Sequence, residues 1–216
     1  MARLPLLLGH RGARASTAIP ENTFASFDLA LEHGCDGFEF DVRLLACGTP
    51  VVCHDPKVRK LTIARATAKQ LPQLPRLGDV IQRYCERAFL NIELKVKDLE
   101  AKVLTALGQF PPKAGYVVSS FIPDVVMNLE ARSASVLIGI ICESTEQLDC
   151  WRKLPVDYVI PHHSLVDRML VQAIHRAGLK ILVWTVNDRA AMVSLAAMGV
   201  DGIISDDTEL LVRTLG

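Results

Sequence analysis

Residues 37–44 read Gly-Phe-Glu-Phe-Asp-Val-Arg-Leu, and residues 89–96 read Phe-Leu-Asn-Ile-Glu-Leu-Lys-Val. Apolar and polar side chains alternate in both stretches, which is the pattern of a β-strand whose successive side chains point to opposite faces. The apolar face suits contact with a layer of helices, so the acidic face points away from the helices. Both stretches therefore indicate strands whose acids face the interior of a closed sheet.

Strand and helix patterns alternate along the whole chain. We predict strands over residues 5–9, 37–44, 89–96, 115–120, 137–142, 158–161, 180–186 and 202–205. Helical periodicity lies between them, over residues 22–33, 77–86, 98–109, 123–131, 145–153, 167–177 and 189–198, and residues 208–215 close the chain. Strict alternation predicts a parallel sheet, and eight units favour its closure into a barrel. The predicted fold is α/β, a (β/α)8 TIM barrel in a single domain over residues 1–216.

Helix ends carry residues that are typical of caps. We expect Asn22 to be an N-cap, and the other expected cap residues are Asp98, Asp167 and Asp188 at or near N-termini and Gly34, Gly178 and Gly199 just past C-termini. No glycine-rich phosphate-binding motif follows the first strand, so the usual sign of a nucleotide-binding open sheet is missing.

One segment interrupts the alternation between the second strand and its helix. Residues 49–54 form a second short β-like run, and the polar residues 55–76 follow it. Loops that leave barrel strands at their C-terminal ends form the functional face of such folds. We expect this short excursion to cover the pocket.

The composition limits the classes of partner. Lys plus Arg equals Asp plus Glu, at 24 each, so no overall field favours nucleic acid or an anionic membrane. The apolar start, residues 4–8, is too short for a signal-peptide core, and no run reaches the length of a membrane span. The six cysteines lack zinc-type spacing and indicate buried thiols in a reducing compartment. We expect a cytoplasmic protein without stable membrane insertion that acts on a small or zwitterionic substrate; the sequence does not indicate the oligomeric state.

Three inward carboxylates converge near the C-terminal ends of the second and third strands. Glu39 and Asp41 share one face of their strand, and Glu93 lies on the corresponding face of the next. Buried like charges need a positive partner, and a hard cation such as Mg²⁺ or Ca²⁺ suits an all-oxygen ligand set. We also expect Asp41→Asn to relieve repulsion in the cation-free protein. The alternative is a set of structural bridges to Lys95, Arg11 and Arg43.

Two histidines end strands on the same face. His10 follows the first strand and His54 ends the extra β-like run, each beside a charged neighbour. Hydrolysis with a leaving alcohol needs one group that takes a proton and one that gives it, which makes both histidines candidates for catalysis. Arg11 and Lys95 are candidates for binding a phosphate.

The order of these and further motifs resembles the signature of the glycerophosphodiester phosphodiesterase family. The matching residues are His10-Arg11-Gly12, Pro20-Glu21-Asn22-Thr23, the strand with Glu39 and Asp41, His54-Asp55, Asn91 to Lys95, Ser119-Ser120-Phe121, Trp184 to Asn187 and Gly199 to Asp206. The resemblance implies a TIM-barrel hydrolase that cuts glycerophosphodiesters to glycerol 3-phosphate and an alcohol. It implies the two histidines as acid and base, and Glu39, Asp41 and Glu93 as metal ligands. It also implies that Phe121 and Trp184 contact the glycerol, with Glu21, Asn187 and Asp206 nearby.

The sequence departs from the family signature at two places, and two alternative functions remain. The family's usual Thr-x-Asp-Gly turn is Leu45-Ala46-Cys47-Gly48 here, and residues 55–76 are shorter than the insertion that many members carry, so the preferred alcohol is open. Which histidine is the acid, and whether water or a substrate hydroxyl attacks, are also open. The alternative functions are cleavage of lysophospholipids, which needs an apolar groove, and a catalytically silent binding protein, which the presence of all five predicted catalytic and ligand residues disfavours.

Overall fold

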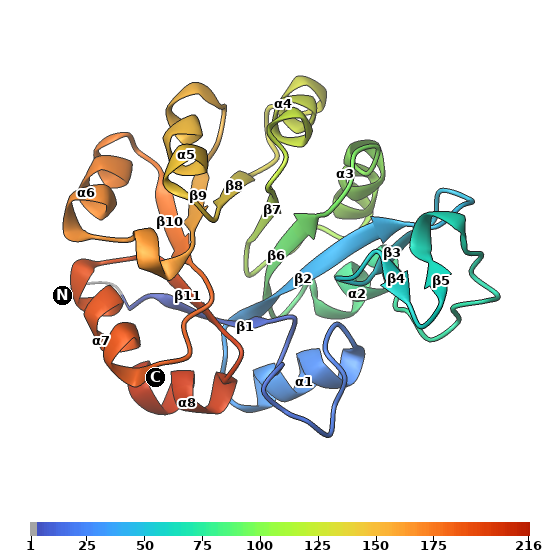
Figure 1. Cartoon of the computed structure of the whole chain (residues 1–216), viewed down its shortest axis with the longest axis horizontal. Helices are drawn as coiled ribbons and strands as arrows, with labels where there is room; N and C mark the ends of the chain where they lie inside the picture. Colours follow the sequence, from blue (N-terminus) through green and yellow to red (C-terminus); the bar gives the residue numbers. More distant parts are fainter. Residues whose placement is uncertain (1–3) are drawn as a thin grey trace.

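Eight parallel strands close into a barrel in the computed structural model, which describes residues 4–216 (Figure 1). Around the ring they run in the order β1, β2, β6, β7, β8, β9, β10 and β11, and β1 pairs with both β2 and β11. Their bounds are β1 Leu6–His10, β2 Gly37–Leu44, β6 Phe89–Leu94, β7 Tyr116–Ser120, β8 Ile138–Cys142, β9 Tyr158–Pro161, β10 Lys180–Val183 and β11 Gly202–Ser205. The predicted TIM barrel is confirmed.

Helices lie on the outside of the barrel between successive strands (Figure 1). They are α1 Phe24–Glu32, α2 Leu77–Tyr84, α3 Glu100–Gln109, α4 Pro123–Arg132, α5 Thr145–Leu148, α6 Arg168–Arg176, α7 Arg189–Met198 and α8 Thr208–Leu215. The helix predicted over residues 145–153 is wrong in its second half, where the 3₁₀ turn η2 (Asp149–Lys153) replaces it. Its first three residues, Asp, Cys and Trp, have low helix propensity, which favours the tighter turn.

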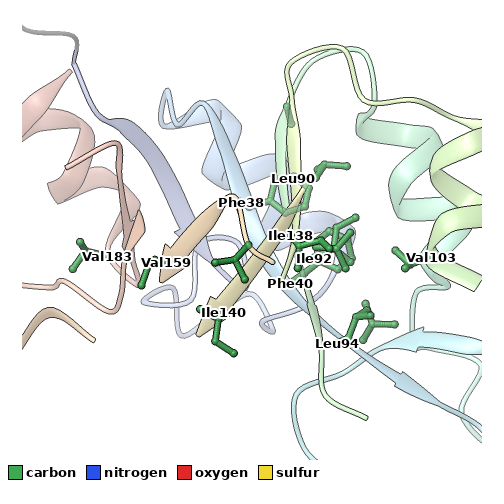
Figure 2. Close-up of a cluster of buried hydrophobic side chains, with 14 of the residues drawn as sticks. Phe38, Phe40, Leu90, Ile92, Leu94, Val103, Ile138, Ile140, Val159 and Val183 are labelled. Carbon is green, nitrogen blue, oxygen red and sulfur yellow. The ribbon is translucent and has the colours of Figure 1, made fainter. Parts of the chain in front are cut away.

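The main hydrophobic core fills the space between the barrel and the helices. Figure 2 shows Phe38 and Phe40 of β2 together with side chains from β6, β8, β9 and β10. The ring of Phe27, from α1, stacks on that of Phe38 with centroids 4.2 Å apart. Aromatic pairs of this kind contribute contact energy beyond the area that they bury. The alternation in β2 therefore places its aromatic face against the helices, as the sequence predicts.

Gly37 allows β2 to pack closely against its neighbour. A Cβ atom at Gly37 would lie 1.9 Å from the carbonyl oxygen of Phe89, which begins β6. A real Cβ atom cannot approach that closely, so only glycine fits where these two strands start. This contact fixes the register that puts Glu39 opposite Asn91 and Asp41 opposite Glu93.

The excursion after β2 packs beside the barrel on a small core of its own. It contains β3 (Pro50–Val52), which pairs antiparallel with β2, the hairpin β4 (Lys57–Val58) and β5 (Leu61–Thr62), and the 3₁₀ turn η1 (Ile63–Arg65). Leu45, Val51, Ile63 and Leu71 are among the side chains of this second core. Figure 1 shows β4 and β5 to one side of the ring of strands. Among the described residues, none of 55–76 lines the pocket at the mouth of the barrel, so a role as its cover is not supported.

Helix ends agree with the sequence at most positions. Asp167 and Asp188 each accept a hydrogen bond from a backbone N–H of the first turn of α6 and α7. The three glycines beyond helix C-termini all have positive φ angles: Gly34, Gly178 and Gly199. The prediction for Asn22 is wrong, because Thr23 is the N-cap of α1.

Two further expectations concern the whole chain. Of the helices within residues 4–216, none is long and apolar enough to cross a membrane. The six cysteines are all free thiols, and four of them are buried, whereas Cys47 is exposed and Cys150 is half-buried. The expectation of uniformly buried thiols is wrong at these two positions.

Candidate active site

A pocket of about 240 Å³ opens at the C-terminal mouth of the barrel. It contains eight of the nine side chains that the sequence singles out: His10, Arg11, Glu39, His54, Glu93, Lys95, Phe121 and Trp184. Asp41 lies beneath the pocket and is 1% exposed. The structure therefore brings the predicted residues together from six separate segments of the chain.

The three carboxylates form one compact, buried cluster. One oxygen from each of Glu39, Asp41 and Glu93 lies within 4.8 Å of the others. The β2–β6 register makes this cluster, since it sets Asp41 directly beside Glu93 on inward-facing positions. Such crowding of like charge is costly unless positive groups surround it.

Asp41 is the carboxylate with most partners. Its Oδ2 lies 3.2 Å from Arg11 Nε, and its Oδ1 lies 3.4 Å from Lys95 Nζ. The side-chain amide of Asn22 also donates a hydrogen bond to Oδ2, at 2.8 Å. Burial alone would raise the pKa of Asp41, but Lys95, Arg11 and the amide outweigh it and hold that pKa below its ordinary value.

Glu39 and Glu93 are less well compensated. Glu39 Oε2 accepts the Arg11 backbone N–H at 3.0 Å, whereas its Oε1 is buried and has no hydrogen-bond partner among residues 4–216. Burial, then Asp41 and Glu93, raise the pKa of Glu39 well above its ordinary value. Glu93 Oε1 lies 2.6 Å from Lys95 Nζ, yet burial and Asp41 still raise the pKa of Glu93 to about 7. The cluster thus lacks positive charge on the side of Glu39.

The backbone after β1 places both the N–H and the side chain of Arg11 against this cluster. Arg11 has a positive φ of 54°, a strained conformation for a residue with a side chain. Its carbonyl accepts hydrogen bonds from the Asn22 N–H and the Ser26 hydroxyl, which hold it there. This conformation presents the Arg11 N–H to Glu39 while the guanidinium reaches Asp41.

Asn22 is a site residue that sequence reasoning misassigned. It is 5% exposed with φ 57°, and its side-chain oxygen accepts the backbone N–H of Asp41 while its amide donates to the same residue's carboxylate. Asparagine tolerates the left-handed conformation better than most residues, which suits this position. The sequence offered only the residue type as a signal, because asparagine is common at helix N-caps. Here its amide group connects to Asp41 instead of capping a helix.

His10 is held by a carboxylate from the far end of the chain. Its Nδ1 lies 2.7 Å from Asp206 Oδ1, just after β11. Arg14 and the amide of Asn187 donate to the same carboxylate, and with His10 they overcome the effect of burial and lower the pKa of Asp206. An ionised carboxylate only accepts, so Nδ1 carries the hydrogen. The free Nε2 faces the carboxylate cluster, 3.8 Å from Glu39 Oε2.

His54 has an exposed partner instead. Its Nδ1 lies 2.8 Å from Oδ1 of Asp55, whose side chain is 71% exposed. The Arg43 guanidinium donates to the carbonyl oxygen of His54 at 2.7 Å and so fixes the backbone at the end of the β3 segment. Arg43 thus acts on the backbone here and pairs with none of the three carboxylates. The Nε2 of His54 is free for chemistry in the pocket.

Two aromatic rings form a wall of the pocket. Phe121 and Trp184 meet edge to face with centroids 5.5 Å apart. Lys95 Nζ lies 5.6 Å from the centroid of Phe121, and the indole N–H of Trp184 donates to the Ile160 carbonyl at 3.0 Å. Both rings are therefore fixed before any ligand binds.

Asn91 is a lining residue that the sequence interpretation passed over. Its side-chain oxygen accepts the Ser119 hydroxyl at 2.7 Å, and its Nδ2 is buried without a hydrogen-bond partner in the part of the chain that the structure describes. It shares the inward face of β6 with Glu93, so strand parity was a signal that could have found it. A buried amide N–H without a partner is suited to donating to a bound ligand.

The buried cluster fits a divalent cation. Three carboxylates lie close to two permanent cations, Arg11 and Lys95. Glu39 Oε1 is buried without a hydrogen-bond partner in the described chain, and the pKa of Glu39 is raised. A hard cation would supply the missing charge and a partner for that oxygen.

The sequence model of the glycerophosphoryl diester phosphodiesterase family matches residues 10–210. YhdW of Bacillus subtilis (strain 168) is 31% identical over an alignment of 237 positions, gaps included, that covers 96% of this chain and 96% of that protein. The crystal structure of the glycerophosphodiester phosphodiesterase of Thermotoga maritima has a TM-score of 0.85 and 25% identity, and 99% of each chain is covered. An Oleispira antarctica phosphodiesterase in complex with its product sn-glycerol-3-phosphate is 27% identical, with a TM-score of 0.85 and coverage of 98% of this chain and 96% of that one. On the strength of these matches, this chain belongs to the glycerophosphoryl diester phosphodiesterase family.

Proposed function

We propose that this chain hydrolyses glycerophosphodiesters to glycerol 3-phosphate and an alcohol. In this proposal Glu39, Asp41 and Glu93 hold Mg²⁺ or Ca²⁺, and His10 and His54 transfer protons. The observation that carries it is the buried three-carboxylate cluster, which shares one pocket with two histidines that each have a free Nε2. The product bound to the Oleispira antarctica phosphodiesterase agrees with this substrate class.

Charge balance supports the same assignment. Arg11 and Lys95 contact the three carboxylates, but Arg11 also pairs with Glu21 at 2.8 Å, so these two cations do not match the acids around them. A divalent cation would supply the missing positive charge and would favour the ionised forms of Glu39 and Glu93, whose pKa values burial raises.

The residues divide the chemistry between them. Held by Glu39, Asp41 and Glu93, a cation would supply Lewis-acid stabilisation of the negative charge that develops on the phosphate. Arg11 and Lys95 orient the phosphate, and the buried amide of Asn91 offers a further hydrogen bond. One histidine removes the proton from the attacking hydroxyl and the other protonates the departing alkoxide, each through Nε2.

The size of the pocket favours a small substrate over a lipid. At about 240 Å³ it lies below the usual range of roughly 300–1,000 Å³ for ligand pockets. Its apolar lining is limited to two aromatic rings and three isoleucines. The cleavage of lysophospholipids, which needs an apolar groove for an acyl chain, is therefore less well supported.

A substrate panel tests the proposal. Glycerophosphocholine, glycerophosphoethanolamine, glycerophosphoglycerol and a lysophospholipid are each incubated with the protein. The release of glycerol 3-phosphate is measured for the three water-soluble diesters, and the release of lysophosphatidic acid is measured for the lysophospholipid. We expect turnover of at least one water-soluble diester, loss of turnover with chelator, and recovery with Mg²⁺ or Ca²⁺. Full turnover after exhaustive chelation would remove the role given to the carboxylates, and turnover of the lysophospholipid alone would favour the alternative substrate class.

A further inference from the structure

The excursion after β2 concentrates positive charge in a chain that is neutral as a whole. Six of the 24 Lys and Arg residues and one of the 24 Asp and Glu residues lie within residues 55–76, so the rest of the chain carries 18 cations against 23 acids. The six cations, which we call the basic patch, are Lys57, Arg59, Lys60, Arg65, Lys69 and Arg76. The balanced total charge therefore hides a local excess of positive charge.

The basic patch is not neutralised by the part of the chain that the structure describes. All six side chains are exposed, and none of them makes an ion pair within residues 4–216. The one acid of the segment, Asp55, has its Oδ1 2.8 Å from Nδ1 of His54. Exposed lysines elsewhere do find acids, since Lys97 and Lys113 each pair at 2.6 Å. The charge of the basic patch is thus free to attract an external partner.

The hairpin of β4 and β5 carries three of these cations at its tip. Val58 pairs with Leu61 across the hairpin, so Arg59 and Lys60 form a two-residue turn that Lys57 precedes closely. Arg59 has a φ of 55°, at a position where Asn or Gly is usual in such turns. Val58 and Leu61 pack against the small core of the excursion. The hairpin therefore keeps its apolar side chains on its own core and exposes its cations.

The basic patch lies beside the mouth of the barrel. The excursion begins directly after His54, which lines the pocket, and β3 pairs with the C-terminal part of β2. Figure 1 shows β4 and β5 near β3, to one side of the ring of strands. A partner that binds the hairpin is therefore held close to the opening of the pocket.

The chemistry of the segment favours an anionic lipid surface over other polyanions. Residues 55–76 contain no Phe, Tyr or Trp that could stack on bases, and no α-helix that could enter a major groove. A protein partner would need an apolar centre to its interface, and the exposed large apolar side chains of the described chain lie outside the excursion. Clusters of about four to eight Lys and Arg residues, by contrast, are typical of segments that bind anionic headgroups.

We propose that the basic patch docks this protein on an anionic bilayer, with the mouth of the barrel beside the lipid headgroups. A glycerophosphodiester is what remains of a phospholipid after both acyl chains have been removed, so deacylating reactions at a bilayer must supply it. This reason for choosing lipid rests on the proposed function. The attachment is peripheral and electrostatic, so it strengthens with the content of anionic lipid and weakens with salt.

Sedimentation with lipid vesicles tests the docking surface. The full chain is mixed with vesicles of phosphatidylglycerol and phosphatidylcholine in equal parts, and with vesicles of phosphatidylcholine alone. We expect binding to the mixed vesicles only, and release in about 1 M NaCl, where the Debye length is about 3 Å. The combined variant Lys57→Gln, Arg59→Gln and Lys60→Gln should lower the partition coefficient about a hundredfold, because each cation near the surface contributes about fivefold. Its melting temperature should match that of wild type, since all three side chains are exposed.

A second variant separates the basic patch from the total charge. Arg132→Gln, Arg168→Gln and Arg189→Gln together remove three exposed cations of α4, α6 and α7 that have no ion pair in the described chain. The change in net charge is the same as in the hairpin variant. We expect the partition coefficient to fall less than about threefold, because these charges lie far from the bilayer and are screened.

Three results would overturn the proposal. They are a wild-type chain that ignores the mixed vesicles in low salt, equal losses in the two variants, and tighter binding to duplex DNA or to polyglutamate than to the vesicles. Turnover of glycerophosphocholine in solution is measured separately. Vesicle binding without turnover removes the proposed function and keeps the docking surface, whereas turnover without vesicle binding removes the docking surface alone.

Discussion

Glu39 and Asp41 lie two residues apart on one strand, yet the protein holds their carboxyl groups very differently. Asp41 contacts Arg11, Lys95 and Asn22, and its pKa is lowered. Glu39 keeps one buried oxygen without a partner, and its pKa is raised. Asp41 therefore stabilises the folded chain by itself, whereas Glu39 needs a cation before its charge becomes favourable.

The two carboxylates should respond in opposite ways to neutralisation in cation-free buffer. Glu39→Gln should match or exceed the wild-type melting temperature, because it removes an uncompensated buried charge. Asp41→Asn should lower the free energy of unfolding by about 3 kcal/mol, because it removes the charge that Arg11 and Lys95 contact in the interior of the barrel. The contacts of Asp41 thus favour the opposite outcome to the one that we expect from the sequence, in which Asp41→Asn relieves repulsion. Thermal unfolding of both variants after chelation checks this, and a more stable Asp41→Asn would contradict the assignment.

The roles of the two histidines can be distinguished by changing the leaving group of the substrate. A general acid matters most when the departing alkoxide is poor, as choline or glycerol is, and little when it is p-nitrophenolate. One of His10→Ala and His54→Ala lacks the general acid. The rate of that variant should fall about a hundredfold on a natural diester and much less on an aryl diester. The rate of the variant that lacks the general base should fall by a similar factor on both substrates. Steady-state rates on both substrates measure this, and small, equal losses throughout would remove both histidines from proton transfer.

The alternation of side chains along the strands predicted which residues lie together in the site, but not the contacts that each of them makes. Glu39, Asp41, Glu93 and Lys95 follow from alternation within two strands, because neighbouring residues on a strand have fixed directions. The contact between His10 and Asp206 joins residues 196 positions apart, and no local pattern encodes it. The roles of all these residues in catalysis remain predictions.

At the scale of elements, one carboxylate links the first two helices. Asp28 of α1 accepts a hydrogen bond from the Tyr84 hydroxyl of α2 at 3.0 Å, and it pairs with Arg83 at 2.6 Å and Arg87 at 2.8 Å. Burial favours the neutral carboxyl, but the Tyr84 hydroxyl and then the arginines outweigh it and lower the pKa of Asp28 below its usual 3.8. The link therefore depends on the ionised form.

The Asp28 link should weaken in acid. A lowered pKa in the folded state contributes stability above the unfolded value of 3.8, and this contribution is lost as the pH falls toward the folded value. Asp28→Asn should be less stable than wild type at pH 7, with a difference that shrinks below about pH 4. Glu32→Gln, an exposed residue of the same helix without an ion pair in the described chain, is the control. Urea unfolding at several pH values tests this, and a constant difference would argue against it.

The sequence predicted the existence of the elements better than their bounds. All eight strands were found because each is a short apolar run between helical patterns, although the strand over residues 180–186 ends at Val183. The hairpin of β4 and β5 was missed, since two-residue strands leave no periodic signal. Its packing on Leu45 and Ile63 is a tertiary effect that composition does not reveal.

At the scale of the whole molecule, the proposed cation site joins β2 to β6 inside the barrel, so binding should stabilise the entire fold. A cation at about 100 times its Kd adds roughly 2.7 kcal/mol. For a chain of this size this corresponds to a rise in melting temperature of about 5–11 °C. Scanning calorimetry with Mg²⁺ or Ca²⁺ measures the rise, and Glu39→Gln should lose most of it. An equal rise in that variant would place the cation elsewhere.

Because Asp206 follows β11, the closing strand of the barrel, the order of synthesis on a ribosome decides when the site is complete. The proposed ligands, both histidines and Lys95 are made first, and a further 111 residues, from 95 to 206, must follow before His10 gains its carboxylate partner. At roughly 5–20 residues per second this takes about 6–22 s. During that time the nascent chain holds the groups proposed for catalysis without the strand that completes the ring. The contact between His10 and Asp206 can therefore form only once the closing strand of the barrel has been made.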